Sequence, residues 1–501
     1  MSNTSTKGIW KVISASSMGT LIEWYDFYIF GSLAVVISTK FFPSDNPTAA
    51  FLSTLATFAA GFVVRPFGAL FFGRLGDLIG RKYTFMVTLL LMGGATFLIG
   101  CIPSFESIGY LAPVLVLILR LLQGLALGGE YGGAATYVAE HAPKGQRGYW
   151  TSWIQTTATA GLFVSLMVIL LTRNLLSPED FDAWGWRVPF WVSIIMVFVS
   201  YMIRKNMSES PVFAKAKAEG KTSTNPLKES FGNRYNLKFV LLALFGATMG
   251  QGVVWYTGQF YAMSFMKTVM NVDSSQVDGL LGIALLFGTP FFVFFGWLSD
   301  KIGRKTIMMS GMLLAILLYR PIYQEMYETV DVKNKTEIPL TAEISGDKKE
   351  TKTGYDVIFN TTRFYSDGTK SVETSITHNT TPKPEIKTAI TINSHDKWLL
   401  VFLVWIQVIF VTMVYGPIAA FLVEMFPLKI RYTSMSLPYH VGNGIFGGLL
   451  PAISTYLVTN AKDNGDAKFY LEGLWYPIII ASICFVIGMI YIDRKNKTIN
   501  D

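Results

Sequence analysis

Twelve long apolar runs dominate this 501-residue chain and leave few folds open to it. They fall at about 12–38, 51–73, 83–101, 111–138, 151–172, 187–203, 237–262, 278–299, 305–321, 398–424, 432–458 and 473–492. Each is close to the roughly 20 apolar residues that cross a bilayer as a helix. Only 15% of the residues are charged, against about 25% in soluble domains. The sequence therefore predicts an all-α membrane protein with twelve transmembrane helices.

Lysine and arginine gather in every second loop between these runs, and we expect those loops to be cytoplasmic. The C-terminal tail, with Arg494, Lys495 and Lys497, falls on the same side. We therefore expect a multi-pass protein of the plasma (inner) membrane with both termini in the cytoplasm. The net charge of +8 then reflects orientation in the bilayer and does not indicate a nucleic-acid partner.

The chain contains an internal repeat. The sequence GRLGDLIGRK at 73–82 follows the second apolar run, and GWLSDKIGRK at 296–305 follows the eighth. A motif at the same place in two six-run halves predicts parallel six-helix halves with a site between them near the membrane midplane. The predicted division is 1–203 for the first half, 204–236 for a cytoplasmic linker, and 237–321 with 398–501 for the second half.

Residues 322–397 interrupt the second half on the extracytoplasmic side. The segment is rich in threonine and charged residues, and two of its stretches, 355–359 and 388–392, favour β-strands. The sequence predicts a small β-rich insert here, and a partly ordered loop is the alternative.

Two carboxylates, Glu23 and Asp26, stand three residues apart inside the first apolar run. At this spacing they share one face of a helix, and charge at such depth is costly without a partner, a proton or water. Asp26 and Arg120 lie about 21 and 27 Å from the cytoplasmic side at 1.5 Å per residue. We expect them to pair, with Asp26 as the proton-coupling residue and Glu23 as a second candidate; a static ion pair is the alternative. On this hypothesis, Asp26→Asn abolishes proton-driven accumulation and leaves some exchange.

Three further sets of residues are candidates for function. Arg65 and Glu130 lie at matched depth, which predicts a buried charge pair with a structural or gating role, with direct proton transfer as the alternative. Exposed pairs are predicted at the span ends, where a network can bias a two-state equilibrium between the halves: Asp77 with Arg81, Glu140 with Arg147, Asp300 with Arg304, and Glu424 with Arg431. The residues predicted to bind substrate are Arg120, Gln155, Gln251, Tyr256, Gln259, Tyr415 and Asn443, each of which could instead bond a neighbouring helix.

Several classes of function are disfavoured by what the sequence lacks. It has no nucleophile–base set, no metal-ligand spacing and no nucleotide-binding motif, so we expect neither an enzyme nor an ATP-driven pump, and no metal or cofactor. Its two cysteines, Cys101 and Cys484, are too few and too scattered for a disulfide framework. A channel is disfavoured because paired loops and buried charges suit alternating access.

Several stretches resemble one family. The paired motif loops resemble the major facilitator superfamily, and EWYDFY at 23–28, RPFG at 65–68 and RLLQGLALGGEY at 120–131 resemble its metabolite:proton symporters, as do 204–211 and 431–436. The resemblance implies import of a small organic acid or zwitterion together with protons, without identifying the substrate. We expect the protein to be a monomer. The resemblance also implies the pairing of Asp26 with Arg120 and a cytoplasmic gate that closes in the outward-open state. The insert at 322–397 departs from the family pattern, and a transporter-derived sensor that binds a ligand through this insert is the alternative.

Overall fold

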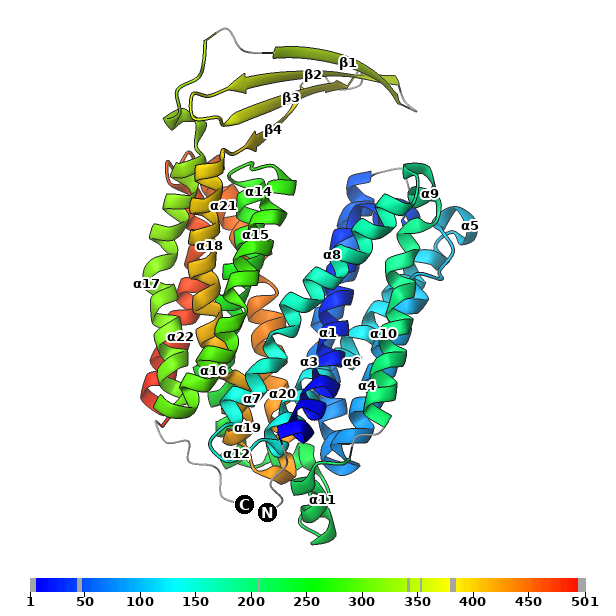
Figure 1. Ribbon diagram of the computed structural model, residues 1–501, viewed down its shortest axis with the longest axis vertical. Helices are drawn as coiled ribbons and strands as arrows, with labels where there is room; N and C mark the ends of the chain where they lie inside the picture. Colours follow the sequence, from blue (N-terminus) through cyan, green and yellow to red (C-terminus); the bar gives the residue numbers. More distant parts are fainter. Residues whose placement is uncertain are drawn as a thin grey trace.

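The computed structural model describes residues 6–42, 47–205, 208–339, 343–351, 354–378 and 384–493. We call α1–α10 the N-half and α12–α22 the C-half, and η marks a short 3-10 or π-helical stretch (Figure 1). The N-half contains α1 (Thr6–Ser32), α2 (Ala34–Phe41), α3 (Pro47–Leu78), α4 (Arg81–Ile99), α5 (Phe105–Ile108), α6 (Leu111–His141), α7 (Arg147–Gln155), α8 (Thr157–Leu175), α9 (Pro178–Ala183), η1 (Gly185–Arg187) and α10 (Val188–Lys205).

The linker and the C-half follow the same pattern of long, broken helices. The linker carries α11 (Pro211–Ala218) and η2 (Lys228–Gly232). The C-half contains α12 (Arg234–Ala243), η3 (Leu244–Thr248), α13 (Met249–Tyr256), η4 (Thr257–Tyr261), α14 (Ala262–Thr268), α15 (Ser274–Gly288), α16 (Pro290–Ile302), α17 (Arg304–Val330), η5 (Val332–Asn334), α18 (Ser394–Tyr415), α19 (Ile418–Met425), η6 (Leu428–Ile430), α20 (Arg431–Val441), η7 (Gly442–Gly447), α21 (Leu450–Asp463), η8 (Phe469–Leu474) and α22 (Trp475–Tyr491).

The helices make this a multi-pass membrane protein. Ten helical stretches among the described residues are long and apolar enough to span a membrane, and the pair α1–α2, bent by 68°, makes eleven. Helix α3 has 32 residues, so its length of about 48 Å also exceeds the hydrocarbon core of a bilayer. Within the described ranges, these helices together match the twelve predicted spans.

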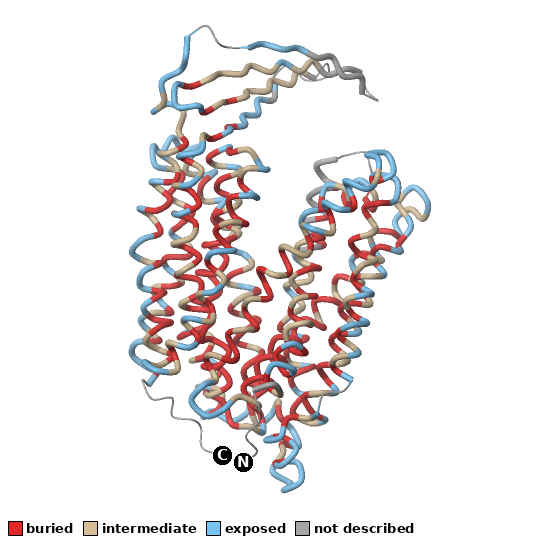
Figure 2. Tube along the Cα trace, viewed as in Figure 1, coloured by how far each residue is buried: buried red, intermediate tan, exposed pale blue. Residues whose placement is uncertain are grey.

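The two halves meet mainly at one end. Helix α1 begins and α22 ends at this end, which we call the terminal end, while the sheet caps the C-half at the opposite end, the sheet end (Figure 1). The halves converge toward the terminal end, and buried residues crowd between them there (Figure 2).

The insert folds as a four-stranded antiparallel sheet. Its strands β1 (Glu343–Thr351), β2 (Gly354–Phe364), β3 (Lys370–His378) and β4 (Glu385–Thr391) pair in sequential order, which confirms the prediction of a β-rich insert. The predicted limits of 322–397 are too wide, because α17 continues to Val330 and α18 begins at Ser394. The apolar run ends at Pro321, but a proline can remain inside a helix at the cost of a backbone hydrogen bond, and α17 continues through it.

Two contacts dock the sheet on the C-half. Ile390 of β4 donates its backbone N–H to the Asn271 carbonyl at 2.7 Å, and its own carbonyl accepts from the Asp273 N–H at 2.9 Å. The Lys335 ammonium lies 2.5 Å from a carboxylate oxygen of Asp367, in the turn between β2 and β3, and 2.5 Å from one of Asp396 on α18. The lysine therefore ties the sheet to the helix that follows it.

Acid is expected to loosen this docking. Burial by itself would raise the pKa of Asp367. The hydrogen bonds from Lys335 and Thr369 lower it by more than burial raises it, so the pKa falls from the usual 3.8 to about 2. A depressed pKa in the folded state stabilises the fold above the unfolded value, and this contribution is lost as pH falls through the folded value. Hydrogen exchange of the β3 and β4 amides should therefore accelerate, beyond its intrinsic pH dependence, between about pH 4 and pH 2. Asp367→Asn is the control, and an unchanged wild-type protection over this range contradicts the prediction.

Candidate functional site

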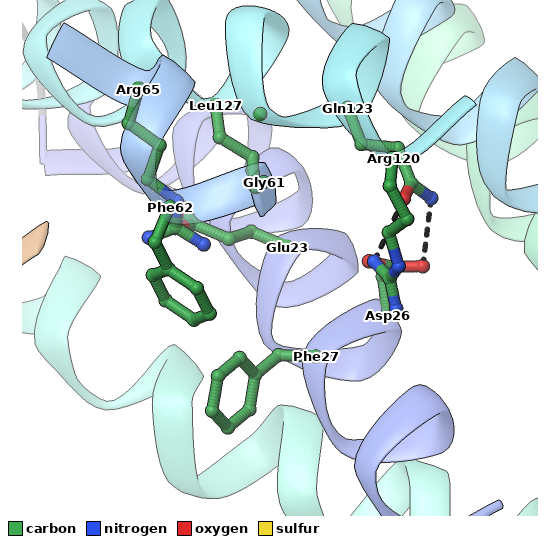
Figure 3. A pocket seen from close by; sticks show the side chains of 10 residues that line it. Glu23, Asp26, Phe27, Gly61, Phe62, Arg65, Arg120, Gln123 and Leu127 are labelled. Atoms are coloured by element: carbon green, nitrogen blue, oxygen red, sulfur yellow. Dashed lines mark hydrogen bonds and ion pairs between the residues drawn. The ribbon is translucent and has the colours of Figure 1, made fainter. Parts of the chain in front are cut away.

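A small cavity lies between α1, α3 and α6 inside the N-half (Figure 3). Its volume is about 20 Å³, and its lining includes Glu23, Asp26, Arg65, Arg120 and Gln123. A space of this size is enough for a water molecule. Four ionisable side chains thus share a water-sized cavity inside a membrane-spanning bundle.

Asp26 is the more fully bonded of the two acids. Arg120 Nη1 donates to Asp26 Oδ2 at 2.7 Å, and Gln123 Nε2 donates to Oδ1 at 2.9 Å. The Thr96 hydroxyl lies 3.1 Å from Oδ1. Only 5% of the Arg120 side chain and 3% of the Asp26 side chain are exposed. The structure brings the predicted pair together and surrounds it with neutral donors.

Glu23 lies on the other side of the cavity, beside Arg65 (Figure 3). The distance from Glu23 Oε1 to Arg65 Nη1 is 3.5 Å, which is long for a hydrogen bond. The Arg65 guanidinium packs over the Phe62 ring, 4.4 Å from its centroid. Arg65 Nε is buried without a partner, and the guanidinium donates no hydrogen bond to any described residue. Glu23 and Arg65 are therefore paired by charge alone.

The predicted pair of Arg65 with Glu130 is wrong. Glu130 Oε1 instead lies 2.5 Å from Arg204 Nη2, and the Thr88 hydroxyl donates to Glu130 Oε2 at 2.8 Å. Helix α6 packs against the Arg65 backbone at Gly128, where a Cβ would lie 2.3 Å from the Arg65 carbonyl oxygen. The Arg65 side chain therefore extends toward α1, because the two residues share a depth but not a facing direction.

Arg204 belongs to the buried interior and not to the linker, where the sequence places it. Its guanidinium donates to the backbone carbonyls of Phe85 at 2.6 Å and Ala15 at 3.1 Å. The ion pair with Glu130 lies directly over Gly19, where a Cβ would come within 1.7 Å of the carboxylate and 1.9 Å of the guanidinium. This cluster joins α1, α4, α6 and α10, and a side chain at position 19 would displace the ion pair from its present place.

Of the predicted substrate-binding residues, Arg120 lines the cavity and the others lie elsewhere among the described residues. Gln251 of α13 and Asn443 of η7 exchange two hydrogen bonds of 3.0 Å within the C-half. Tyr256 is buried against Gly447 of η7, and Gln259 is buried in the π-helical turn η4. In this conformation the two amides satisfy each other, so they tie two elements of the C-half together.

A tyrosine cluster joins the halves. Tyr131 of α6 stacks on Tyr439 of α20 with 3.7 Å between ring centroids. The hydroxyl of Tyr439 lies 2.6 Å from that of Tyr415, and Gln155 donates to the Tyr131 hydroxyl at 2.7 Å. The predicted residues Gln155 and Tyr415 thus meet at the contact between the halves, through two tyrosines that sequence reasoning missed.

Two aromatic contacts continue this interface. Trp24 and Trp255 approach with 4.8 Å between ring centroids, and Phe27 and Phe260 with 5.0 Å. Phe27 also lines the cavity. The cavity therefore lies on the N-half side of an aromatic layer that both halves build.

Each copy of the repeated motif sends an aspartate to a helix of the other half. Asp77, at the end of α3, accepts backbone hydrogen bonds of 3.3 and 2.8 Å from the first turn of α20. Asp300 of α16 accepts backbone hydrogen bonds of 2.9 and 2.8 Å from the first turn of α7. A carboxylate is stabilised there by free N–H groups and by the helix dipole. The repeat thus builds two equivalent contacts between the halves at the terminal end.

Two of the four predicted pairs at the span ends are present, but both are buried and not exposed as predicted. Asp77 lies 3.1 Å from Arg81, and Asp300 lies 2.6 Å from Arg304. Both pairs are four residues apart in sequence, a spacing that brings side chains together on a helix. Arg81 also lies 3.7 Å from Glu140.

The other two predicted pairs are wrong. Glu140 lies 3.1 Å from Arg431 of the other half instead of pairing with Arg147. Glu424 lies 3.1 Å from Arg304 instead of pairing with Arg431. The observed partners come from neighbouring elements at the terminal end, and proximity in sequence does not reveal them.

Sequence reasoning also missed two neutral groups at Asp26. Gln123 follows Arg120 by three residues, which places both on one helix face. This spacing could have predicted that Gln123 also lies beside Asp26. Thr96 comes from α4, and no spacing in the sequence connects it to Asp26. The first neighbour was predictable, and the second required the packed structure.

Comparison with known proteins places the chain among transporters. Residues 11–232 match a family model described as "Sugar (and other) transporter". Over 481 residues the chain is 31% identical to the inner membrane metabolite transport protein YhjE of Escherichia coli (strain K12), covering 94% of this chain and 92% of that protein. Over 471 residues it is 28% identical to the citrate-proton symporter of Salmonella typhi, covering 93% and 92%.

The fold agrees with this similarity. The chain superimposes on the major facilitator superfamily proton:xylose symporter XylE, bound to 6-bromo-6-deoxy-D-glucose, with a TM-score of 0.64. The match covers 96% of this chain and 94% of that one at 16% identity. The chain therefore belongs to the metabolite transporters of the major facilitator superfamily, which are membrane transporters and not enzymes.

Proposed function

We propose that the protein is a proton-coupled symporter that imports a small organic acid or zwitterionic metabolite by alternating access. The observation that carries the proposal is the cavity in which Glu23, Asp26, Arg65 and Arg120 meet. Two carboxylates and two guanidinium groups are neutral together, so one bound proton creates a positive charge that an anionic substrate group can balance. The citrate-proton symporter among the relatives is named for the same pairing of a proton and a carboxylate.

The terminal end faces the cytoplasm of a bacterial cell in this proposal. The loops at that end carry the lysine and arginine residues expected on the cytoplasmic side, and one relative is named an inner membrane protein. The contacts between halves made by Asp77 and Asp300, and the ion pair of Glu140 with Arg431, close this end in the present conformation. Substrate and protons then reach the cavity from the sheet end.

Transport requires these terminal-end contacts to break. As the halves rock about the stacked pair Tyr131–Tyr439, the two aspartates leave the helix N-termini that they stabilise. The change costs only a few hydrogen bonds and ion pairs, which suits a two-state equilibrium that substrate and protons can shift. The loaded cavity then opens to the cytoplasm.

Uptake into proteoliposomes tests the proposal. The purified protein is reconstituted and supplied with radiolabelled citrate, 2-oxoglutarate, proline or glycine betaine under an acid-outside pH gradient. We expect at least one of these compounds to accumulate above its outside concentration, with alkalinisation of the medium and loss of accumulation when a protonophore is added. Protein-free liposomes and liposomes without a gradient are the controls.

A different outcome identifies the alternative function. The described residues of the outer strands β1 and β4 are largely exposed (Figure 2). The sheet docks on α18 through Lys335, so a ligand bound there has a route to the helices. If none of the four compounds crosses the membrane, yet one raises the melting temperature of the protein, the symport proposal fails and a transporter-derived sensor is favoured.

A further inference from the structure

We propose that Glu23 and Arg65 form a proton-controlled carboxylate site. Glu23 carries the coupled proton, and Arg65 binds a carboxylate group of the substrate once Glu23 is neutral. The inference rests on the proposed symport function and assigns its two chemical steps to residues. Asp26, which the sequence favours as the proton carrier, stays ionised throughout.

Asp26 is a poor site for a proton. Its carboxylate accepts hydrogen bonds from Arg120 and Gln123, with the Thr96 hydroxyl at 3.1 Å. Hydrogen bonds to the charged form favour that form. Protonation would also leave the Arg120 charge uncompensated inside the membrane, which is costly. The Asp26–Arg120 pair is therefore a fixed framework for the cavity.

Glu23 has the opposite surroundings. Its one ionic partner among the described residues is Arg65 at 3.5 Å, and none of these residues donates a hydrogen bond to its carboxylate. Its side chain is 9% exposed, and it lines a space that admits a water molecule. A proton can therefore reach Glu23 and neutralise it at the expense of a single long contact.

Arg65 differs from the buried arginines in lacking a hydrogen-bond acceptor among the described residues. Arg81, Arg120 and Arg204 each donate hydrogen bonds to carboxylates or backbone carbonyls. Arg65 donates none to any described residue, although a guanidinium carries five N–H donors. Its Nε is a buried donor without a partner among the described residues, which is unfavourable, and the planar fork of arginine fits a carboxylate with two parallel bonds. These properties point to an acceptor that arrives from outside the protein.

The other charged groups around Glu23 are already paired. Asp26 is bound to Arg120, and Glu130 is bound to Arg204. Helix α8 packs on α1 at Gly161, and its one ionisable residue, Arg173, is twelve positions further on. From α6 and the C-half, the ionisable groups are Tyr131, Tyr256, Tyr415, Tyr439 and His440. Tyrosines remain neutral at physiological pH, so Glu23 is the acid whose charge is free to change.

Proton and carboxylate binding must then be cooperative. A neutral Glu23 no longer occupies Arg65, so affinity for a carboxylate rises as pH falls through the titration of Glu23. Linkage makes the effect reciprocal: a bound carboxylate favours protonation of Glu23 to the same extent. For one coupled proton, the affinity changes at most tenfold per pH unit.

Infrared pH-difference spectra of the full-length protein in lipid nanodiscs test the proton assignment. Between pH 8 and pH 5 the wild-type protein should gain a carboxyl C=O band assigned to a membrane-buried acid, and this band should be absent in Glu23→Gln. Glu472→Gln, whose residue pairs with Arg320 away from the cavity, is the matched control and should retain the band. The band reports carboxyl groups, so titration of His440 cannot produce it. If the Glu23→Gln spectrum reproduces the wild-type spectrum in full, with no component lost, the assignment is overturned.

The carboxylate assignment is tested by repeating the titration with acetate, succinate or citrate as the probe. At least one of these anions should move the midpoint of the band to higher pH in the wild type and should leave it unmoved in Arg65→Gln. Arg320→Gln is the matched control and should retain the shift. Two results would overturn the assignment of carboxylate binding to Arg65. One is a midpoint shift in Arg65→Gln as large as in the wild type, and the other is no midpoint shift in the wild type with any of the three anions.

Failure of this inference is distinguishable from failure of the proposed function. Proton-driven accumulation that survives in Glu23→Gln liposomes overturns the inference and leaves symport in place. Absence of any wild-type uptake, together with the expected infrared bands, overturns symport and leaves the site in place.

Discussion

Replacing Arg120 by glutamine is expected to destabilise the protein by about 3–5 kcal/mol, because one partner of a buried ion pair is removed. Asp26 would remain as a carboxylate that is 3% exposed, inside a bundle that offers it no other cation at hydrogen-bonding distance among the described residues. The loss should appear as a lower melting temperature in detergent or nanodiscs, and as loss of uptake, because the cavity is built on this pair.

Two further variants separate a buried charge from a general effect of removing arginine. Arg320→Gln breaks a pair whose side chains are 31% and 30% exposed, and the expected cost is about 0–1 kcal/mol. The double variant Asp26→Asn with Arg120→Gln removes both charges, so it should be more stable than Arg120→Gln alone. If Arg120→Gln melts at the wild-type temperature, the pair is not the framework that the geometry indicates.

The helices could be predicted from sequence because the bilayer imposes one rule on all of them. A chain in lipid must satisfy its backbone internally over about 20 residues, so apolar run length reports each span directly. This rule does not apply outside the bilayer, where water can satisfy the backbone of any segment. The predicted limit of span nine at Pro321 failed for this reason, since α17 continues to Val330 and supports the sheet.

The site could be predicted in part, because sequence gives depth but not direction. Asp26 and Arg120 were found from their matching depths and opposite charges. Matching depth failed for Arg65 and Glu130, since the contact of Gly128 with the Arg65 backbone directs that side chain toward α1. Gly128 determines how the neighbouring helix is rotated through a packing contact, and residue spacing in the sequence does not predict such a contact.

At the terminal end, too, some contacts could be predicted from the sequence and others could not. Asp77 with Arg81 and Asp300 with Arg304 followed from helical spacing. The contacts from Asp77 and Asp300 to the other half did not, because their partners are backbone N–H groups that carry no sequence signal. The repeated motif indicated that the two halves correspond, and only the fold shows that each aspartate reaches across to the other.

Neutralising both motif aspartates is expected to shift the protein toward opening at its terminal end. In Asp77→Asn and Asp300→Asn the amide keeps one acceptor oxygen and turns an NH₂ group toward a backbone N–H donor. Each change should cost the closed state about 1–3 kcal/mol, the usual loss when a buried donor is left unpaired. The two contacts lie at separate helices and should add, so the double variant should shift the equilibrium more than tenfold.

Spin-label distance measurements can follow this shift. Labels at Lys144→Cys and Lys301→Cys, both exposed at the terminal end, report the separation of the halves in a background of Cys101→Ser and Cys484→Ala. The double aspartate variant should populate a longer distance than the parent, and each single variant should fall between them. Asp463→Asn, an exposed aspartate at the end of α21, is the matched control and should reproduce the parent distribution. If the double variant also reproduces the parent distribution, the aspartates do not hold the halves together and do not explain why both halves carry the motif. The closed state would then be stabilised by the Glu140–Arg431 pair and the tyrosine stack.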